Sequence, residues 1–159
     1  MKIVATLGEI DKVIKELQER RRWIEEKSLL LTERLASIGA TNASLEFARA
    51  IIDENDVEIT VERDGDTFII KASGNEVAFI EFGAGITYGY GYPNAGELGV
   101  GPGTYPEGKG HWSNPSGWWY TDENGNSKHT YGNPPNMPMY NTARLLERQI
   151  EQIAREVFG

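Results

Sequence analysis

The stretch that decides the fold reads Asn75-Glu76-Val77-Ala78-Phe79-Ile80-Glu81-Phe82-Gly83-Ala84-Gly85. At the two-residue period of a strand, Val77, Phe79 and Glu81 share one face, and Ala78, Ile80 and Phe82 share the other. Two glycines, Gly83 and Gly85, follow the apolar run, and glycine there is typical of a strand end. The pattern therefore predicts a buried strand that ends in a turn.

Two further strands precede this one. Residues 57–62 alternate strictly between apolar and polar side chains, Asp64-Gly65 is a two-residue hairpin signal, and residues 68–72 are apolar again. Gly74-Asn75 is a second tight turn, so we expect a three-stranded antiparallel meander. The two turns set a register that pairs Val61 with Phe68, Ile59 with Ile70, and Val57 with Ala72. The core face then consists of Val57, Ile59, Val61, Phe68, Ile70, Ala72, Val77 and Phe79.

A long amphipathic helix is predicted before the sheet. Its apolar residues recur three and four positions apart, at Leu7, Ile10, Ile14, Leu17, Ile24, Leu31, Leu35 and Ile38. Arg21 and Ser28 fill two positions of the same stripe, and Gly39 is the expected stop. So small a sheet cannot bury the whole stripe. Either the helix bends or breaks, or the unburied part of its apolar stripe packs on another subunit, which heptad-like spacing allows. The favoured interpretation is a core helix of one domain. A shorter helix over residues 43–53 follows, with Thr41 or Asn42 as its cap.

The composition changes after Gly85. All seven prolines and three of the four tryptophans follow Phe82, and such a long aromatic stretch without helical or strand periodicity predicts a functional arm at about residues 86–135. Within the arm, Asn124-Gly125 predicts a β-hairpin. The residues that we expect at an assembly interface are Tyr88, Tyr90, Tyr92, Trp112, Trp118, Trp119 and Tyr120.

The last element is a helix that opens at Asn136-Met137-Pro138, with proline in its first turn. Its predicted buried stripe is Met139, Ala143, Leu146, Ile150, Ile153 and Val157. We expect this helix to pack on the sheet. Residues 1–159 then form a single α+β domain with the arm as an insertion.

Composition narrows the classes of function. The chain has no cysteine, which excludes a disulfide framework and a thiolate nucleophile and fits a reducing cytoplasm. A net charge of -8 and a pI near 4.8 argue against nucleic-acid binding. No apolar stretch predicts a signal peptide or a membrane span, so we expect a soluble, non-secreted protein.

Candidate catalytic residues are sparse. His111 and His129 are the only histidines, and Asp122 and Glu123 lie near the second, but the loop lacks calcium-ligand spacing. Phosphate-loop, nucleophile-elbow and dinucleotide motifs are missing as well. Trp112 and its aromatic neighbours could line a carbohydrate site, without a recognisable carboxylate pair. We expect no enzyme, cofactor or metal site.

The order of these features resembles the tail-completion, or head-tail joining, proteins of long-tailed bacteriophages, the group that includes the minor tail protein Z of phage lambda. The family's Glu-Phe-Gly-Thr-Gly strand end is matched by residues 81–85, with Ala84 in place of threonine. Its Gln-Pro-Phe-like helix opening is matched by Met137-Pro138-Met139, followed by Tyr140. The Trp-Trp-Tyr hairpin at residues 118–120 resembles versions from phages of Gram-positive hosts.

The resemblance implies a structural, non-enzymatic virion protein that is made in the host cytoplasm. It would form a homo-oligomeric ring in the neck, between the head connector or stopper protein and the tail terminator or tail tube protein. It would bind neither membrane nor specific nucleic acid. The alternative is a carbohydrate-binding or cell-wall-active module that uses the aromatic arm.

Three finer expectations concern single features. Glu81 falls on the core face beside Phe68, where its carboxylate needs donors, either Arg144 or the amides of residues 83–85. Deletion of residues 86–116 is expected to leave the fold intact. If the protein forms a ring around exiting DNA, Glu58, Glu62 or Asp66 is expected to lie nearer the inner surface of the ring than the outer one, where an acidic lining repels phosphates.

Overall fold

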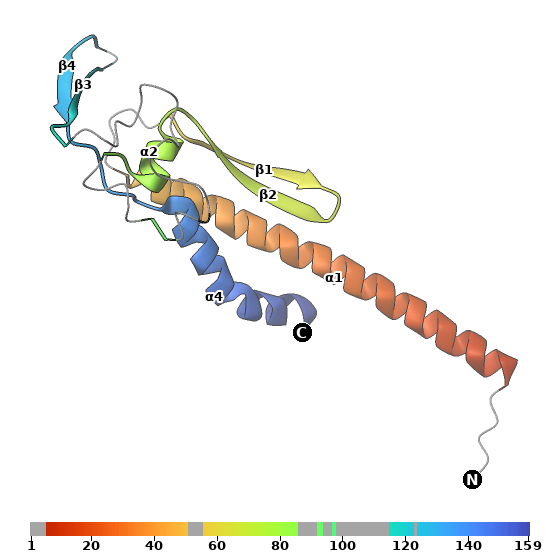
Figure 1. Cartoon of the computed structure of the whole chain (residues 1–159). Helices are drawn as coiled ribbons and strands as arrows, with labels where there is room; N and C mark the ends of the chain where they lie inside the picture. Colours follow the sequence, from red (N-terminus) through yellow and green to blue (C-terminus); the bar gives the residue numbers. More distant parts are fainter. Residues whose placement is uncertain (1–5, 51–55, 86–91, 94–96, 98–114, 123) are drawn as a thin grey trace.

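The computed structural model describes residues 6–50, 56–85, 92–93, 97, 115–122 and 124–159 (Figure 1). The elements are α1 (Leu7–Ala48), β1 (Glu58–Asp64), β2 (Thr67–Ser73), α2 (Val77–Phe82), β3 (Trp118–Thr121), β4 (Ser127–Thr130) and α4 (Pro138–Phe158). The α+β class is confirmed. The strands form two separate antiparallel pairs, β1-β2 and β3-β4.

Helix α1 is one continuous helix of 42 residues. It begins with a capping box, in which the Glu9 amide donates to Thr6 Oγ1 (3.3 Å) and the Thr6 amide donates to the Glu9 carboxylate (2.8 Å). The predicted break at Gly39 and the separate second helix are wrong. Glycine inside a helix costs only about 1 kcal/mol relative to alanine, and close packing against this glycine offsets that cost.

Gly39 is a point of close approach between three elements. It is buried, and a β-carbon there would collide with Ile70 Cδ1 of β2 and lie 3.0 Å from Leu146 Cδ1 of α4. Ala36 and Ala43, one helical turn to either side, are buried too. These small residues let the β1-β2 hairpin and α4 both pack closely on the C-terminal half of α1.

The β1-β2 hairpin turns at Gly65-Asp66, one residue later than predicted. Asp64 pairs with Thr67, and Val61 therefore pairs with Ile70 rather than with Phe68. The partner of each β1 residue moves by two positions, so every side chain keeps its predicted face. Ile59 and Ala72 accordingly pack against the core, while Val61 towards the tip is 43% exposed.

The third strand is wrong, because residues 77–82 form the short helix α2. The chain leaves β2 through Gly74 (φ 145°), and the Asp56 carboxylate accepts hydrogen bonds from the amides of Asn75 (3.0 Å) and Glu76 (3.4 Å). The Asn75 amide is the main reason that the pKa of Asp56 lies below its usual value. This turn directs the segment off the sheet edge. A short apolar run is ambiguous between strand and buried helix, and tertiary contacts decide it.

The core lies where α2 meets the C-terminal end of α1. Ile80, predicted for the outer face of the meander, is fully buried against Phe47 and Ala50. Five partly buried residues pack around this cluster, namely Val57, Ile59, Ala72, Val77 and Met139.

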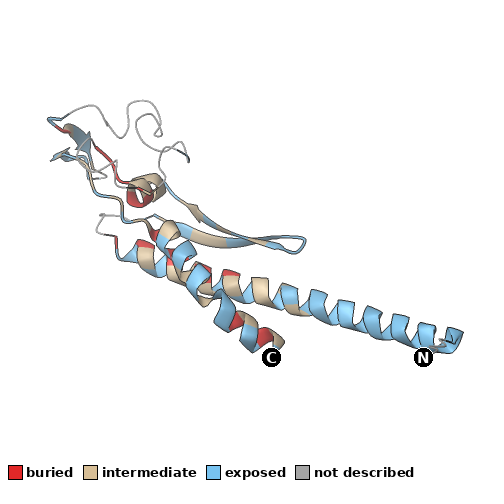
Figure 2. Ribbon diagram, turned by 60° about the horizontal axis from the view of Figure 1, so that its bottom comes forward, coloured by how far each residue is buried: buried red, intermediate tan, exposed pale blue. Residues whose placement is uncertain are grey.

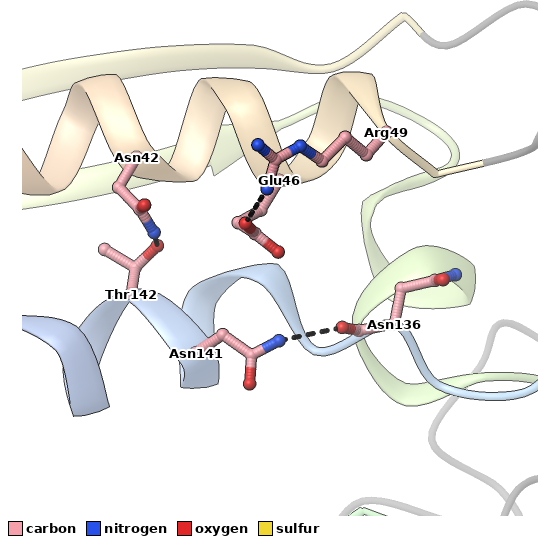
Figure 3. Close-up of polar contacts among 6 residues, drawn as sticks. All are labelled: Asn42, Glu46, Arg49, Asn136, Asn141 and Thr142. Carbon is pink, nitrogen blue, oxygen red and sulfur yellow. Dashed lines mark hydrogen bonds and ion pairs between the residues drawn. The ribbon is translucent and has the colours of Figure 1, made fainter.

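Helix α4 packs antiparallel along α1 and against α2, rather than on the sheet as predicted (Figure 1). Asn42 Nδ2 of α1 donates to the buried Thr142 Oγ1 of α4 at 2.9 Å, as Figure 3 shows. At the other end of α4, the Phe158 ring lies 5.7 Å from the Trp23 ring. Ile153 and Val157 are buried as predicted, whereas Ala143 and Ile150 face solvent because α4 turns a different side towards α1.

The N-terminal half of α1 projects beyond this core. Residues 6–26 are all exposed, and Figure 2 shows the buried positions confined to the other end of the helix. Phe158, the last residue of α4, packs on Trp23 of this half through its ring. The molecule thus has a packed end and a bare helical end.

We predict that Gly39→Val lowers the melting temperature of the protein. The added side chain must displace Ile70 and Leu146, and overpacking of this kind costs about 1–3 kcal/mol. The matched control is Gly8→Ala, because a β-carbon at Gly8 meets nothing within 4 Å. This control should melt at the parent temperature or above it in a thermal scan followed by circular dichroism. Equal melting of Gly39→Val and the parent would contradict the close approach.

Candidate functional site

The Glu81 carboxylate joins α2 to the first turn of α4. Its side chain is buried, with 3% of the residue exposed. Oε2 accepts a hydrogen bond from the Met139 amide (2.8 Å), and Oε1 accepts one from the Tyr140 amide (3.0 Å). Both amides belong to the first turn of α4, where backbone N–H groups have no partner within the helix. Glu81 therefore caps α4 from a distant part of the sequence, and its negative charge suits the positive end of the helix dipole.

The N-cap residue of α4 explains why an outside cap is needed. Met137 makes no capping hydrogen bond through its side chain, and its backbone is left-handed, with φ 59°. A non-glycine residue in that region is strained by about 1 kcal/mol or more. The Asn136 amide just before it donates to the Ile80 carbonyl at 2.9 Å. The chain is thereby held in place for Pro138 to be buried and for α4 to begin.

Backbone hydrogen bonds beside Glu81 strengthen the same contact between the end of α2 and the start of α4. Ala84 and Asn133 exchange two backbone hydrogen bonds of 2.9 and 3.1 Å, and Asn133 Nδ2 donates to the Phe79 carbonyl at 2.7 Å. Gly83 (φ 75°) could not carry a β-carbon, because that carbon would lie 2.7 Å from the Asn133 carbonyl oxygen. Gly83 thus permits residues 132–135 to pass close to the end of α2.

Tyr92 completes the site. Its hydroxyl donates to Glu81 Oε1 at 2.8 Å, and its ring lies edge-on to Phe82 (4.8 Å) and Tyr140 (5.9 Å). Burial, together with the hydrogen bond to Glu81, raises the pKa of the Tyr92 hydroxyl above its usual value. Tyr92, which we expected at an assembly interface, is buried within the chain beside Glu81.

The predicted burial of Glu81 is confirmed. The hydrogen-bond donors predicted for its carboxylate are wrong. Arg144 pairs with the exposed Glu147 instead. The amides of Gly83 and Ala84 donate to the Phe79 and Asn133 carbonyls. Because residues 77–82 are a helix, the quoted stretch is a helix end and not a strand end. No local pattern identifies Tyr92 or the α4 amides as partners, since they lie far from Glu81 in sequence.

The β3-β4 hairpin carries a second group of predicted residues. Trp119 pairs with His129 across the strands, and the His129 ring lies 5.0 Å from Trp119 and 4.8 Å from Tyr131. Trp119 and Tyr131 are 68% and 61% exposed. We call these three residues the aromatic row. Tyr120 is also exposed and Trp118 is half-buried, whereas Tyr88, Tyr90 and Trp112 lie outside the described residues.

The described residues show no arrangement suited to metal binding. They contain no group of three metal-ligating side chains, and Asp122 accepts from the Asn126 amide (2.7 Å) and pairs with Lys128 (3.3 Å). The Asn126 amide is the main cause of the lowered pKa of Asp122. His111 lies outside the described residues. None of the described helices is long and apolar enough to cross a membrane.

One shallow pocket, of about 430 Å³, lies between α1 and the start of α4. Three of the residues that line it, Asn42, Glu46 and Asn141, are labelled in Figure 3. Tyr140, Arg144, Leu145 and Arg148 complete the lining. Glu46 already pairs with Arg49 at 2.7 Å. The pocket opens to solvent.

Comparison with known proteins finds no relatives. No protein-family model matches the chain, and neither the curated proteins nor the solved structures include a match.

We predict that Glu81→Ala lowers the free energy of unfolding by about 3 kcal/mol, because it leaves one buried and two partly buried donors without their acceptor. Glu81→Gln should cost less, since an amide oxygen can replace Oε1. Glu58→Ala is the matched control, because Glu58 is exposed. Urea unfolding of the three variants checks the order, and equal stability of Glu81→Ala and Glu58→Ala would contradict the capping role.

The raised pKa of Tyr92 predicts an alkaline loss of stability. The folded pKa lies above the unfolded value of about 10, so the contribution of the hydroxyl is complete below about pH 10 and falls as the pH rises further. Tyr92→Phe keeps the ring and removes that contribution, at a cost of about 1.5 kcal/mol at neutral pH. Urea unfolding from pH 8 to 11 should show the gap between parent and variant shrink above pH 10.

A constant gap across that range would contradict this assignment. Residues 86–116, whose deletion is expected to leave helix content and thermal unfolding largely intact, include Tyr92. That deletion removes Tyr92 and with it a hydrogen bond to Glu81.

Proposed function

We propose that this chain is a structural protein of the neck of a long-tailed bacteriophage, where it forms a ring that joins the head connector to the tail. The proposal starts from the resemblance of residues 81–85 and 137–139 to the tail-completion proteins. These two motifs meet in the structure, because Glu81 of the first caps the amide of Met139 in the second. This contact gives a structural reason for the two motifs to occur together in one chain.

The observation that carries the proposal is the large apolar surface on the projecting half of α1. Leu7 is 82% exposed, Leu17 is 63% exposed and Val13 is 51% exposed. Soluble proteins that act alone rarely expose contiguous apolar surface of this kind, and such surface marks a site for protein contact. A protein that works by holding neighbours needs docking surface more than it needs a catalytic pocket.

A second docking surface lies at the opposite end of the molecule. The β3-β4 hairpin with its aromatic row is far from the free end of α1 in both Figure 1 and Figure 2. Exposed Trp and Tyr are enriched at protein interfaces. Contact surfaces at two opposite ends suit a component that joins two partners.

The charge of the β1-β2 hairpin fits a position beside passing DNA. Glu58, Glu62 and Asp66 are all exposed, and Lys71 neutralises only Glu62, at 3.2 Å. An acidic surface repels phosphates. We propose that this hairpin faces the channel through which DNA leaves the head.

Carbohydrate binding is the second candidate, because Trp119 and Tyr131 expose large ring areas to solvent. It predicts that cell-wall glycan binds the full chain and that Trp119→Ala abolishes this binding, while Leu17→Glu leaves it unchanged. The neck role predicts no glycan binding. Isothermal titration with purified wall fragments separates the two candidates.

We predict that particles assembled without this chain accumulate as separate heads and tails, and that the purified chain restores joining. Electron microscopy counts the joined particles. Trp119→Ala and Leu17→Glu should each reduce joining, whereas Glu19→Gln, on a solvated part of α1, should not. Normal joining without the chain would refute the proposal.

We also predict that the chain does not shift duplex DNA in a gel at physiological salt, because a surface with net charge -8 gains nothing from counterion release. Tight binding in this assay would contradict the channel-facing placement of the β1-β2 hairpin.

A further inference from the structure

The projecting half of α1 carries a regular heptad seam. If Leu7 is placed at position a, positions a and d through the next heptads are Leu7, Ile10, Ile14, Leu17, Arg21, Ile24, Ser28 and Leu31. Ile10, Ile14 and Ile24 are each 46% exposed, and Leu7 and Leu17 more so. The hairpin and α4 contact α1 through other positions, such as Gly39. Within the described chain, the seam from Leu7 to Ile24 therefore has no cover.

The bare half of α1 is poorly supported by its own interactions. Its capping box and two exposed i,i+4 ion pairs, Lys12 with Glu16 (3.9 Å) and Arg21 with Glu25 (2.7 Å), are weak in water. Helices in proteins owe most of their stability to packing of an apolar face. A seam at the coiled-coil spacing is suited to packing against another helix.

The charges beside the seam distinguish the possible partners. Position g carries Val13, Arg20 and Lys27, and position e carries Asp11, Gln18 and Glu25. In a parallel pair of α1 helices, g contacts e of the next heptad, which places Arg20 beside the partner's Glu25. In an antiparallel pair, g meets g and e meets e, so no contact between opposite charges forms at these positions. The pattern therefore favours a parallel pair of identical helices.

Arg21 and Ser28 determine the register of this pair. Polar residues at position a favour pairing with their own equivalents, at some loss of affinity, because a shift of one heptad would bury Arg21 against Ile14. Arg21 can occupy the seam because its aliphatic stem is apolar and its Nε already donates to Glu25 of the same helix at 2.7 Å. Arg20 is also held in place, with its guanidinium carbon 5.8 Å from the centre of the Trp23 ring.

We propose that a second copy of this chain covers the N-terminal half of α1, with the two helices parallel and in register and Arg20 of each copy beside Glu25 of the other. The inference rests on the proposed function only in that both assign the exposed seam to protein contact. It names the partner of that seam and its orientation. The compact ends of the two copies then lie at the same end of the pair.

Cysteine cross-linking of the full chain tests the orientation, because the chain has no cysteine of its own. Ile10→Cys and Ile24→Cys place single thiols two heptads apart on the seam, about 21 Å along the helix. In a parallel, in-register pair, each variant forms a disulfide with itself under mild oxidation. The matched controls are Lys12→Cys and Glu26→Cys at the outer position f, and these should remain monomeric on a non-reducing gel. Cross-linking only in a mixture of the Ile10→Cys and Ile24→Cys variants would show an antiparallel pair and overturn the proposal.

Charge exchange tests the predicted contact between Arg20 and the partner's Glu25. Arg20→Glu and Glu25→Lys each create like-charge pairs in their own homodimer, so each should dissociate more readily than the parent in sedimentation equilibrium. An equimolar mixture of the two variants restores both opposite-charge pairs and should associate like the parent. Failure of the mixture to recover association would overturn the pairing.

Leu17→Glu tests the seam itself. It should raise the dissociation constant roughly tenfold or more, because two leucines leave the interface, and Glu19→Gln should change it less than about twofold. Circular dichroism at each concentration verifies that the core remains folded. A parent protein that stays monomeric at every concentration would overturn the inference.

Failure of this inference and failure of the proposed function give different results. If the chain is monomeric but restores head-tail joining, the function stands and the partner of the seam is another protein. If the chain self-associates in parallel but particles join without it, the inference stands and the neck role fails.

Discussion

The fold depends on the cap that Glu81 places on α4. A buried carboxylate needs donors, and the first turn of a helix has backbone donors without acceptors. The two needs are met by each other, at 2.8 and 3.0 Å. Tyr92 adds a third donor from a separate segment of the chain. One side chain thus ties together α2, α4 and Tyr92, and it compensates for the strained backbone at Met137.

The second constraint is the close approach at Gly39. Because Gly39 has no side chain, Ile70 and Leu146 from two different elements pack directly on the α1 backbone. The hairpin and α4 therefore gather around the C-terminal half of α1, and the core forms there, around Phe47 and Ile80. The same arrangement leaves the N-terminal half of α1 without intramolecular cover (Figure 2). The helix therefore has its core contacts at one end and a long exposed surface at the other.

These two constraints place the surfaces that matter for the proposed role. The joint at Glu81 fixes the path of residues 131–138, from which the β3-β4 hairpin projects, and the packing at Gly39 fixes the direction in which α1 leaves the core. The aromatic row and the heptad seam lie at opposite ends of the molecule as a result. Neither surface resembles a catalytic site, and both have the composition of protein contacts.

Much of this architecture follows from local sequence. The 3.6-residue period predicts α1 and α4, the turn signals predict both hairpins, and the α+β class follows from these elements. The heptad seam and the charges beside it are also present in the sequence alone. The even shift in the β1-β2 register shows the limit of such rules, because the turn signal was misplaced by one residue while the face pattern still held.

Only the tertiary structure decided the features that involve distant residues. Residues 77–82 have an apolar pattern that a strand or a buried helix could satisfy, and the turn held by Asp56 and the contacts of Ile80 select the helix. Gly39 is a helix stop by local rules, but its close contacts with Ile70 and Leu146 make it part of a continuous helix. The donors to Glu81 come from residues far along the chain. Periodicity determines which side chains share a face. The donors to a buried carboxylate such as Glu81, and the side chains that pack on a glycine such as Gly39, depend on how the elements pack together.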